Sequence, residues 1–187
     1  MHATIITFAP MLLKLKLTPA IYLVGFMGCG KSTVGVALAD ELGWPFFDLD
    51  HEIEKHEGRS ITSIFHEEGE TAFRAVETAA LRRRIISAGS GRPQVVALGG
   101  GVFTVTENCL LANQNGVTVW LDAPLHVMER RVAEETHRPL ARDPQRLREL
   151  YYARRDAFQQ TDYRIETGEG DTTSVVQQIL KLPIFVP

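Results

Sequence analysis

Residues 20–33, Ala20-Ile-Tyr-Leu-Val-Gly-Phe-Met-Gly-Cys-Gly-Lys-Ser-Thr33, decide the fold of this chain. The first five are apolar and predict a buried strand. Between Lys31 and Leu42, apolar residues recur every four positions, at Val34, Leu38 and Leu42, which predicts a helix with one face on a sheet. The chain is therefore expected to run from a strand through a glycine-rich turn into a helix.

The turn between this strand and helix carries the pattern GxxxxGK[ST] through Gly25, Gly30, Lys31 and Ser32. Glycines allow successive backbone N–H groups to point at one anion, and the helix N-terminus adds its positive dipole end. Lys31 is expected to reach the β- and γ-phosphates of ATP, and the Ser32 hydroxyl to ligate Mg²⁺ as cofactor. The predicted ATP-binding residues of the turn are Gly28, Cys29, Gly30, Lys31, Ser32 and Thr33. Cys29 is interpreted as a small loop residue rather than a redox group.

Farther along, short apolar runs alternate with helical periodicity, which is typical of an α/β protein with a parallel sheet. Further strands are expected at residues 46–49, 94–98, 117–121 and 163–166. Residues 50–88 carry no strand candidate and are predicted to be helical, with breaks at Gly58 and Gly69. The expected fold is a three-layer P-loop NTPase sandwich with a five-stranded parallel sheet, similar to the nucleoside monophosphate kinases, plus a helical insert.

Length and composition limit the function classes. At 187 residues the chain fits one domain, expected at 20–182, after an extension at 1–19 that we predict is disordered in part. A net charge of −3 argues against a nucleic-acid binder, and the apolar run near the start is too short to span a membrane. The two cysteines, Cys29 and Cys109, lack metal-ligand spacing, so we expect reduced thiols and a cytoplasmic protein.

Two acidic residues and one arginine are candidates for catalysis. Asp48 and Asp50 stand two residues apart at the end of the second predicted strand, so in an extended segment both would face one ligand cleft. Alternatively, Asp50 only caps a helix that starts at His51. Arg138, in a loop with two prolines, could close over the γ-phosphate, or it could be an ordinary solvated charge.

The ordered set of motifs resembles the shikimate kinase family, from about Ile21 to Leu180. The phosphate turn GFMGCGKST matches that family's GxxGxGKST, and four further motifs follow in the family's order. They are Asp48-Leu-Asp50, Phe73-Arg74-x-x-Glu77, Gly99-Gly100-Gly101 and Arg138-Pro139-Leu140. Arg155, followed by Phe158 and Tyr163, lies where the family keeps a substrate-binding arginine. The phosphate turn alone is generic, but the ordered set is specific.

The resemblance implies ATP-dependent phosphorylation of the 3-hydroxyl of shikimate, a step of aromatic amino acid biosynthesis, with ATP and shikimate as partners of a monomer. Arg74 and Arg155 would bind the shikimate carboxylate, and Asp50 would orient the hydroxyl as a catalytic residue. Glu77 would hold Arg74 in place. The remaining implied shikimate contacts are the backbone of Gly99, Gly100 and Gly101 and the rings of Phe65 and Phe73.

On the nucleotide side, the resemblance implies that Asp48 holds Mg²⁺ through water together with Ser32, and that Arg131 stacks on adenine. Lys31 and Arg138 would be catalytic at the γ-phosphate. The implied substrate-binding insert covers about residues 48–88 and the mobile lid about 136–146. Residues 167–171 lack a proline that some family members place there, so adenine contacts in this stretch stay unassigned. Arg142 is an alternative to Arg138.

Two other functions fit parts of the pattern. Another small-molecule kinase of this architecture, such as a gluconate kinase, would also bind a hydroxylated carboxylate, although the motif order disfavours it. A non-catalytic nucleotide-binding module would need the phosphate turn, but it would require neither Asp50 nor a pair of arginines for an acceptor. Turnover with shikimate or with gluconate separates these alternatives.

Overall fold

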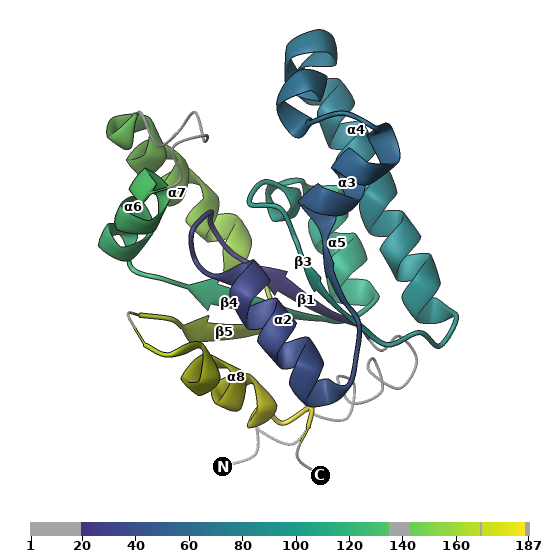
Figure 1. Cartoon of the computed structure of the whole chain (residues 1–187), viewed down its shortest axis with the longest axis vertical. Helices are drawn as coiled ribbons and strands as arrows, with labels where there is room; N and C mark the ends of the chain where they lie inside the picture. Colours follow the sequence, from purple (N-terminus) through teal and green to yellow (C-terminus); the bar gives the residue numbers. More distant parts are fainter. Residues whose placement is uncertain (1–19, 135–142, 169, 186–187) are drawn as a thin grey trace.

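The computed structural model describes residues 20–134, 143–168 and 170–185, and Figure 1 colours these along the chain. The predicted extension at 1–19 lies outside the described residues. So do Arg138, Arg142 and most of the segment predicted to be a lid.

A parallel sheet forms the centre of the molecule, with its strands in the order β2-β3-β1-β4-β5 (Figure 1). β1 pairs with β3 and β4 in parallel, and Tyr22 lies opposite Val96 and Thr118. Every residue of β1 is buried, as expected for a central strand covered on both faces. The strands are β1 (Ala20–Val24), β2 (Phe46–Asp48), β3 (Gln94–Ala97), β4 (Val117–Asp122) and β5 (Tyr163–Glu166). The predicted five-stranded parallel sheet is confirmed.

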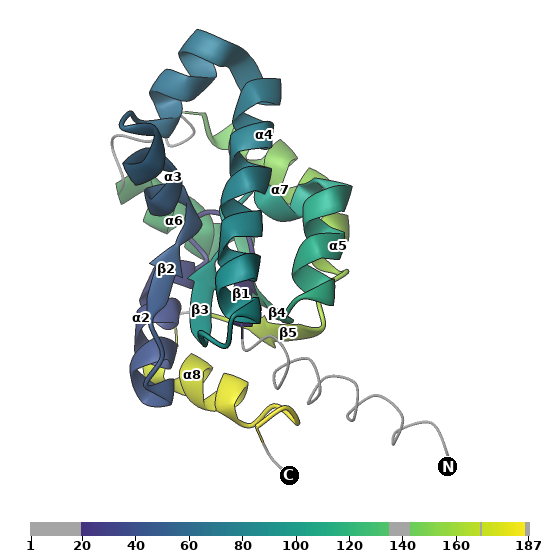
Figure 2. The same cartoon turned by 90° about the vertical axis from the view of Figure 1, so that its right-hand side faces the viewer.

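Helices cover both faces of this sheet and make the sandwich three layers thick (Figure 2). One face carries α2 (Lys31–Leu42) and α8 (Thr172–Leu180). The other carries α4 (Ile61–Gly89), α5 (Thr106–Gln114) and α7 (Pro144–Phe158), with the short 3₁₀ turn η1 (Val102–Thr104). In Figure 1, α3 (Leu49–Glu57) and the outer part of α4 rise on one side of the phosphate turn, and α6 (Leu125–Glu134) and α7 rise on the other.

The helical insert has the breaks that the sequence predicts. Gly58 ends α3 in the left-handed conformation with φ 67°. Ser60 caps α4 through a hydrogen bond from the Ser63 N–H, and Gly69 interrupts α4 with φ 82° and ψ 176°. Since only glycine adopts such a conformation readily, these two positions fix the shape of the insert.

The end of β2 differs from the prediction. The strand stops at Asp48, and Leu49 already begins α3, so Asp48 and Asp50 do not share an extended segment. The alternative that Asp50 caps the helix is wrong as well. Asp48 is the cap, because its side chain accepts a hydrogen bond from the Asp50 N–H at 3.1 Å.

One continuous apolar core lies between the layers, built around the fully buried side chains of β1, β3 and β4. Its largest buried side chains include Tyr22, Phe26, Phe103 and Phe158. Within the described ranges, no helix is both long and apolar enough to cross a membrane.

Candidate active site

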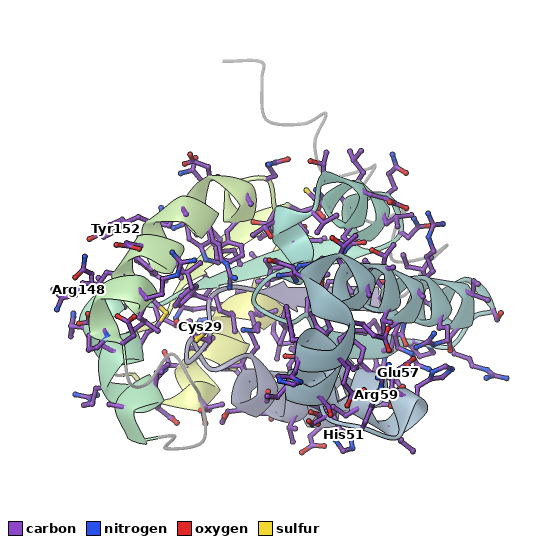
Figure 3. The ribbon with its side chains drawn as sticks, turned by 90° about the horizontal axis from the view of Figure 1, so that it is seen from above. Cys29, His51, Glu57, Arg59, Arg148 and Tyr152 are labelled. Atoms are coloured by element: carbon purple, nitrogen blue, oxygen red, sulfur yellow. The ribbon has the colours of Figure 1, made fainter. Side chains whose placement is uncertain are left out.

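A cavity of about 470 Å³ opens where β1, β2 and β3 end, at the carboxyl edge of the sheet. This is the edge at which open α/β sheets bind ligands. Figure 3 looks down on this edge and shows Cys29 near the middle, with Arg148 and Tyr152 at one rim and Glu57 and Arg59 at the other. The cavity is lined by Met27, Gly28, Cys29, Gly30, Lys31, Ser32, Thr33, Val34, Asp48, Asp50, Leu98, Gly100, Arg131, Thr167, Gly168, Gly170, Thr172 and Val175.

The phosphate turn joins β1 to α2 along one wall of this cavity. Gly30 is the N-cap of α2 with φ 99° and offers no side-chain cap, so the first N–H groups of the helix are left for an anion. The Lys31 ammonium lies within the turn, where it donates hydrogen bonds to the carbonyl oxygens of Gly25 at 2.9 Å and Phe26 at 3.0 Å. Cys29 is buried in the same turn. The predicted phosphate-binding residues therefore share one wall.

Ser32 and Asp48 meet at the foot of the turn. The Ser32 hydroxyl donates a hydrogen bond to Asp48 Oδ2 at 2.7 Å, while Asp48 Oδ1 accepts the Asp50 N–H. A hydroxyl and a carboxylate side by side are oxygen ligands, which suit Mg²⁺, an ion that usually keeps several waters and takes few protein ligands. No cluster of three or more His, Cys, Asp or Glu that could hold a metal occurs in the described part of the chain.

The glycine turn after β3, Gly99-Gly100-Gly101, is approached by three charged side chains from different helices. A Cβ on Gly99 would collide with the Asp50 carboxylate, and a Cβ on Gly101 would lie 2.5 Å from Arg74 Nη1. The middle residue, Gly100, accepts a hydrogen bond from Arg154 Nη1 at 3.3 Å. Asp50 of α3 and Arg74 of α4 can approach this closely only because Gly99 and Gly101 carry no side chains, whereas a Cβ on Gly100 would lie at an ordinary distance of 3.6 Å from Arg154 Nη1.

Arg74 is held in place by acidic residues of its own helix. Its guanidinium donates to Glu77 at 2.8 Å and to Glu70 at 3.1 Å. Glu77 is 1% exposed, and its burial raises the pKa of the carboxyl group above the ordinary value despite the opposing effect of Arg74. The guanidinium also lies over the Phe73 ring, which stacks on Phe65 at 4.4 Å between ring centroids. Glu77 thus lies where the resemblance implies.

The second arginine at the glycine turn is Arg154, whereas the resemblance implied Arg155. The Arg154 guanidinium lies 5.7 Å from the centroid of the Phe26 ring. Burial lowers the pKa of Arg154 below its ordinary value, and the positive charge of Arg74 lowers it further. Arg155 instead binds both carboxylate oxygens of Asp122 at 2.9 Å and lines a separate cavity of about 410 Å³. The structure therefore corrects the placement of Arg155.

Helical phase explains why the sequence pattern indicated Arg155 rather than its neighbour Arg154. The buried stripe of α7 contains Leu147, Tyr151 and Phe158. Arg154 lies three residues after Tyr151 and four before Phe158, and Arg155 lies four residues after Tyr151 and three before Phe158. The two arginines therefore flank this stripe on opposite sides. Only the elements packed beside α7 determine which flank faces the glycine turn.

Arg131 bridges two walls of the main cavity. It donates from Nη1 to the Gly28 carbonyl oxygen at 3.1 Å and from Nη2 to that of Gly168 at 3.4 Å. Thr167, next to Gly168, is buried, and its hydroxyl has no hydrogen-bond partner among the described residues. The stretch that the sequence left unassigned thus contributes Thr167, Gly168 and Gly170 to the cavity wall.

A phosphate turn at the carboxyl edge of a parallel sheet, next to a carboxylate and two guanidinium groups, places the chain in the class of P-loop small-molecule kinases. The family model described as shikimate kinase matches residues 27–182. The chain belongs to the shikimate kinase family.

Individual relatives agree with this assignment. A curated shikimate kinase from Persephonella marina is 42% identical over 86% of this chain and 96% of its own length. The solved structure of a shikimate kinase from Acinetobacter baumannii in complex with shikimate is 38% identical with a TM-score of 0.81, and the match covers 91% of this chain and 96% of that one. A gluconokinase structure from Sinorhizobium meliloti is 19% identical with a TM-score of 0.56, over 90% of this chain and 92% of that one, which shows a shared fold alone.

Proposed function

We propose that this chain transfers the γ-phosphate of ATP to the 3-hydroxyl of shikimate, giving shikimate 3-phosphate and ADP. The convergence of Asp50, Arg74 and Arg154 on the glycine turn, beside the phosphate turn, carries this proposal. The similar Acinetobacter baumannii enzyme was solved in complex with shikimate, which supports this choice of acceptor.

ATP binds with its phosphates along the phosphate turn. Lys31 exchanges its bonds to the carbonyls of Gly25 and Phe26 for phosphate oxygens, and the free N–H groups at the start of α2 complete the cradle. Arg131, already beside Gly28 and Gly168, stacks on the adenine.

The Ser32 hydroxyl and, through water, the Asp48 carboxylate would hold Mg²⁺, which would supply positive charge next to the phosphates. Ser32 and Asp48 already touch at 2.7 Å, so the protein brings its ligands together before the nucleotide arrives. Asp48 has a second task, since it also caps α3 and so fixes the position of the next residues.

The acceptor carboxylate binds between Arg74 and Arg154. Burial and the positive charge of Arg74 lower the pKa of Arg154, and an anion between the two guanidinium groups would offset this penalty. A guanidinium also matches the planar geometry of a carboxylate. Phe65 and Phe73, stacked beside Arg74, remain candidates for contact with the shikimate ring.

Asp50 orients the reacting hydroxyl. It lies against Gly99 and lines the main cavity together with Lys31, so a hydroxyl bound there is within reach of both the carboxylate and the phosphate turn. In a loose phosphoryl-transfer transition state the acceptor needs little proton removal, so positioning is the main work of Asp50.

The remaining predictions from the sequence concern the insert, the lid, the oligomeric state and the cellular compartment. We infer a substrate-binding insert made of α3 and the outer part of α4, and a lid at residues 136–146 that carries Arg138 and lies mostly outside the described residues. The chain acts as a monomer in the cytoplasm. The two free cysteines, Cys29 and Cys109, are both buried, which fits a reducing compartment.

A coupled ADP-release assay with shikimate and with gluconate tests the proposed function. Shikimate-dependent ADP release is expected, with phosphate on the 3-hydroxyl identified by phosphorus NMR, and gluconate should give only the background rate. Turnover with gluconate would instead indicate a sugar-acid kinase. Tight ATP binding without turnover of either acid would indicate a non-catalytic nucleotide-binding module.

A further inference from the structure

A buried carboxylate at the end of β4 binds arginines of α7 and of the neighbouring strand β5. Asp122 is 7% exposed and binds both terminal nitrogens of Arg155, each at 2.9 Å. It also accepts a hydrogen bond from Arg164 Nε of β5 at 2.9 Å and forms an ion pair with Arg164 Nη2 at 2.7 Å. Both guanidinium groups lie over the Trp120 ring, at 4.9 and 5.1 Å from its centroid. A two-pronged ion pair of this kind fixes direction as well as distance.

A series of side-chain contacts on one turn of α7 connects this ion pair to the proposed acceptor site. Arg155 contacts the Tyr151 hydroxyl and lies 5.2 Å from the centroid of the Tyr151 ring. Tyr151 packs edge-on against Phe26 at 5.7 Å, and the Arg154 guanidinium lies over Phe26 on the side of the glycine turn. Arg154 and Arg155 thus hold the two flanks of one helical turn, and Phe26 lies between Tyr151 and Arg154.

Arg154 needs support from its helix, because its immediate surroundings hold it weakly. It donates one long hydrogen bond, 3.3 Å to the Gly100 carbonyl oxygen, within the part of the chain that the structure describes. It also faces the like charge of Arg74 from a partly buried position, a repulsion that the carboxylates of Glu77 and Glu70 only partly offset. A small rotation of α7 would therefore move Arg154 away from Arg74 and widen the gap that the carboxylate must bridge.

We propose that the Asp122–Arg155 ion pair is a positioning device that sets the rotation of α7 and so holds Arg154 opposite Arg74 for the acceptor carboxylate. This inference rests on the proposed role of Arg154 in shikimate binding. Neither Asp122 nor Arg155 lines the main cavity, in which the nucleotide and the reacting hydroxyl are proposed to bind. Their loss therefore affects shikimate binding more than ATP binding.

Steady-state kinetics of Arg155→Gln and Asp122→Asn test this role. For each variant, the KM for shikimate should rise by about threefold to tenfold, while kcat and the KM for ATP stay within about twofold of wild type. Arg155→Lys keeps the charge but loses the two-pronged geometry, so it should restore part of the shikimate affinity. A lower melting temperature with unchanged KM values would overturn the proposal in favour of a purely structural ion pair.

Arg148→Gln is the matched control on the same helix. Arg148 points outward at the rim of the molecule in Figure 3 and pairs with Glu129 of α6 at 2.5 Å. Removing this exposed pair also takes one ion pair from α7, but far from the glycine turn, so the KM for shikimate should not change. An equal rise of this KM in Arg148→Gln would overturn the proposal, because any loosening of α7 would then suffice.

Repeating Arg155→Gln in an Arg154→Lys background decides whether the effect passes through Arg154. If it does, Arg155→Gln should add less than about 1.5-fold to the KM for shikimate in that background. The same factor in both backgrounds would show that Arg155 acts independently, which overturns the inference. If Arg154→Lys leaves the KM unchanged, the failure lies in the proposed acceptor site itself.

Discussion

Replacing Gly101 with alanine tests how closely Arg74 must approach the glycine turn for the acceptor to bind. Gly101 has φ −105° and ψ −15°, a conformation that alanine adopts without strain. The added methyl group points at the Arg74 guanidinium, and Gly101 does not line the main cavity. The substitution therefore acts on Arg74 while leaving the backbone and the cavity walls intact.

The expected size of the effect follows from the contact distances. The new Cβ would lie 2.5 Å from Arg74 Nη1 and 2.8 Å from Nη2, whereas ordinary contact begins at 3.4 Å. The guanidinium must therefore retreat by about 0.9 Å (3.4 − 2.5 Å). A shift of this size misaligns a hydrogen bond between charged groups, which contributes about 1.5–3 kcal/mol. The KM for shikimate should accordingly rise by about 10- to 150-fold.

The assay is coupled ADP release, first with shikimate varied at saturating ATP and then with ATP varied at saturating shikimate. The KM for ATP should stay unchanged, and the melting temperature should fall slightly, because moving Arg74 Nη1 also weakens its 2.8 Å hydrogen bond to the buried Glu77. In an Arg74→Gln background, Gly101→Ala should have little further effect, since no guanidinium is left to displace. A KM for shikimate within about twofold of the parent protein would refute the assignment of Arg74 as a carboxylate ligand.

Three further predictions concern catalysis, the metal and stability. Asp50→Asn should lower kcat by about 100-fold or more while ATP binding persists, and near-normal turnover would contradict its role. Chelation of Mg²⁺ should abolish turnover, and Asp48→Asn should raise the Mg²⁺ concentration for half-maximal activity by about tenfold; an unchanged Mg²⁺ titration would exclude Asp48 from the metal site. Because burial raises the pKa of Glu77 above 4.5, the folded chain binds this proton more tightly than the unfolded chain. The unfolding free energy of wild type should therefore fall relative to that of Glu77→Gln as the pH rises from 4.5 through the raised pKa. If the unfolding free energies of the two proteins depend on pH in the same way, the pKa of Glu77 is not raised.

The sequence by itself determined the sheet, the phosphate turn and the breaks in the insert. The strand at 20–24 and the helix at 31–42 have the predicted bounds. Gly58 and Gly69 interrupt the helical insert where expected. These features depend on apolar periodicity and on glycine conformations, which are properties of a few consecutive residues. Neighbours distant in sequence are not needed to predict them.

Side-chain direction required the tertiary structure. Asp48 and Asp50 do line one cavity, but through a strand end and a helix start rather than through one extended segment. Arg154 and Arg155 flank the same buried stripe of α7, and only the glycine turn on one side and Asp122 on the other decide their contacts. The reason is geometric: periodicity fixes which face of an element is buried, whereas the flank that meets a ligand depends on what packs beside it.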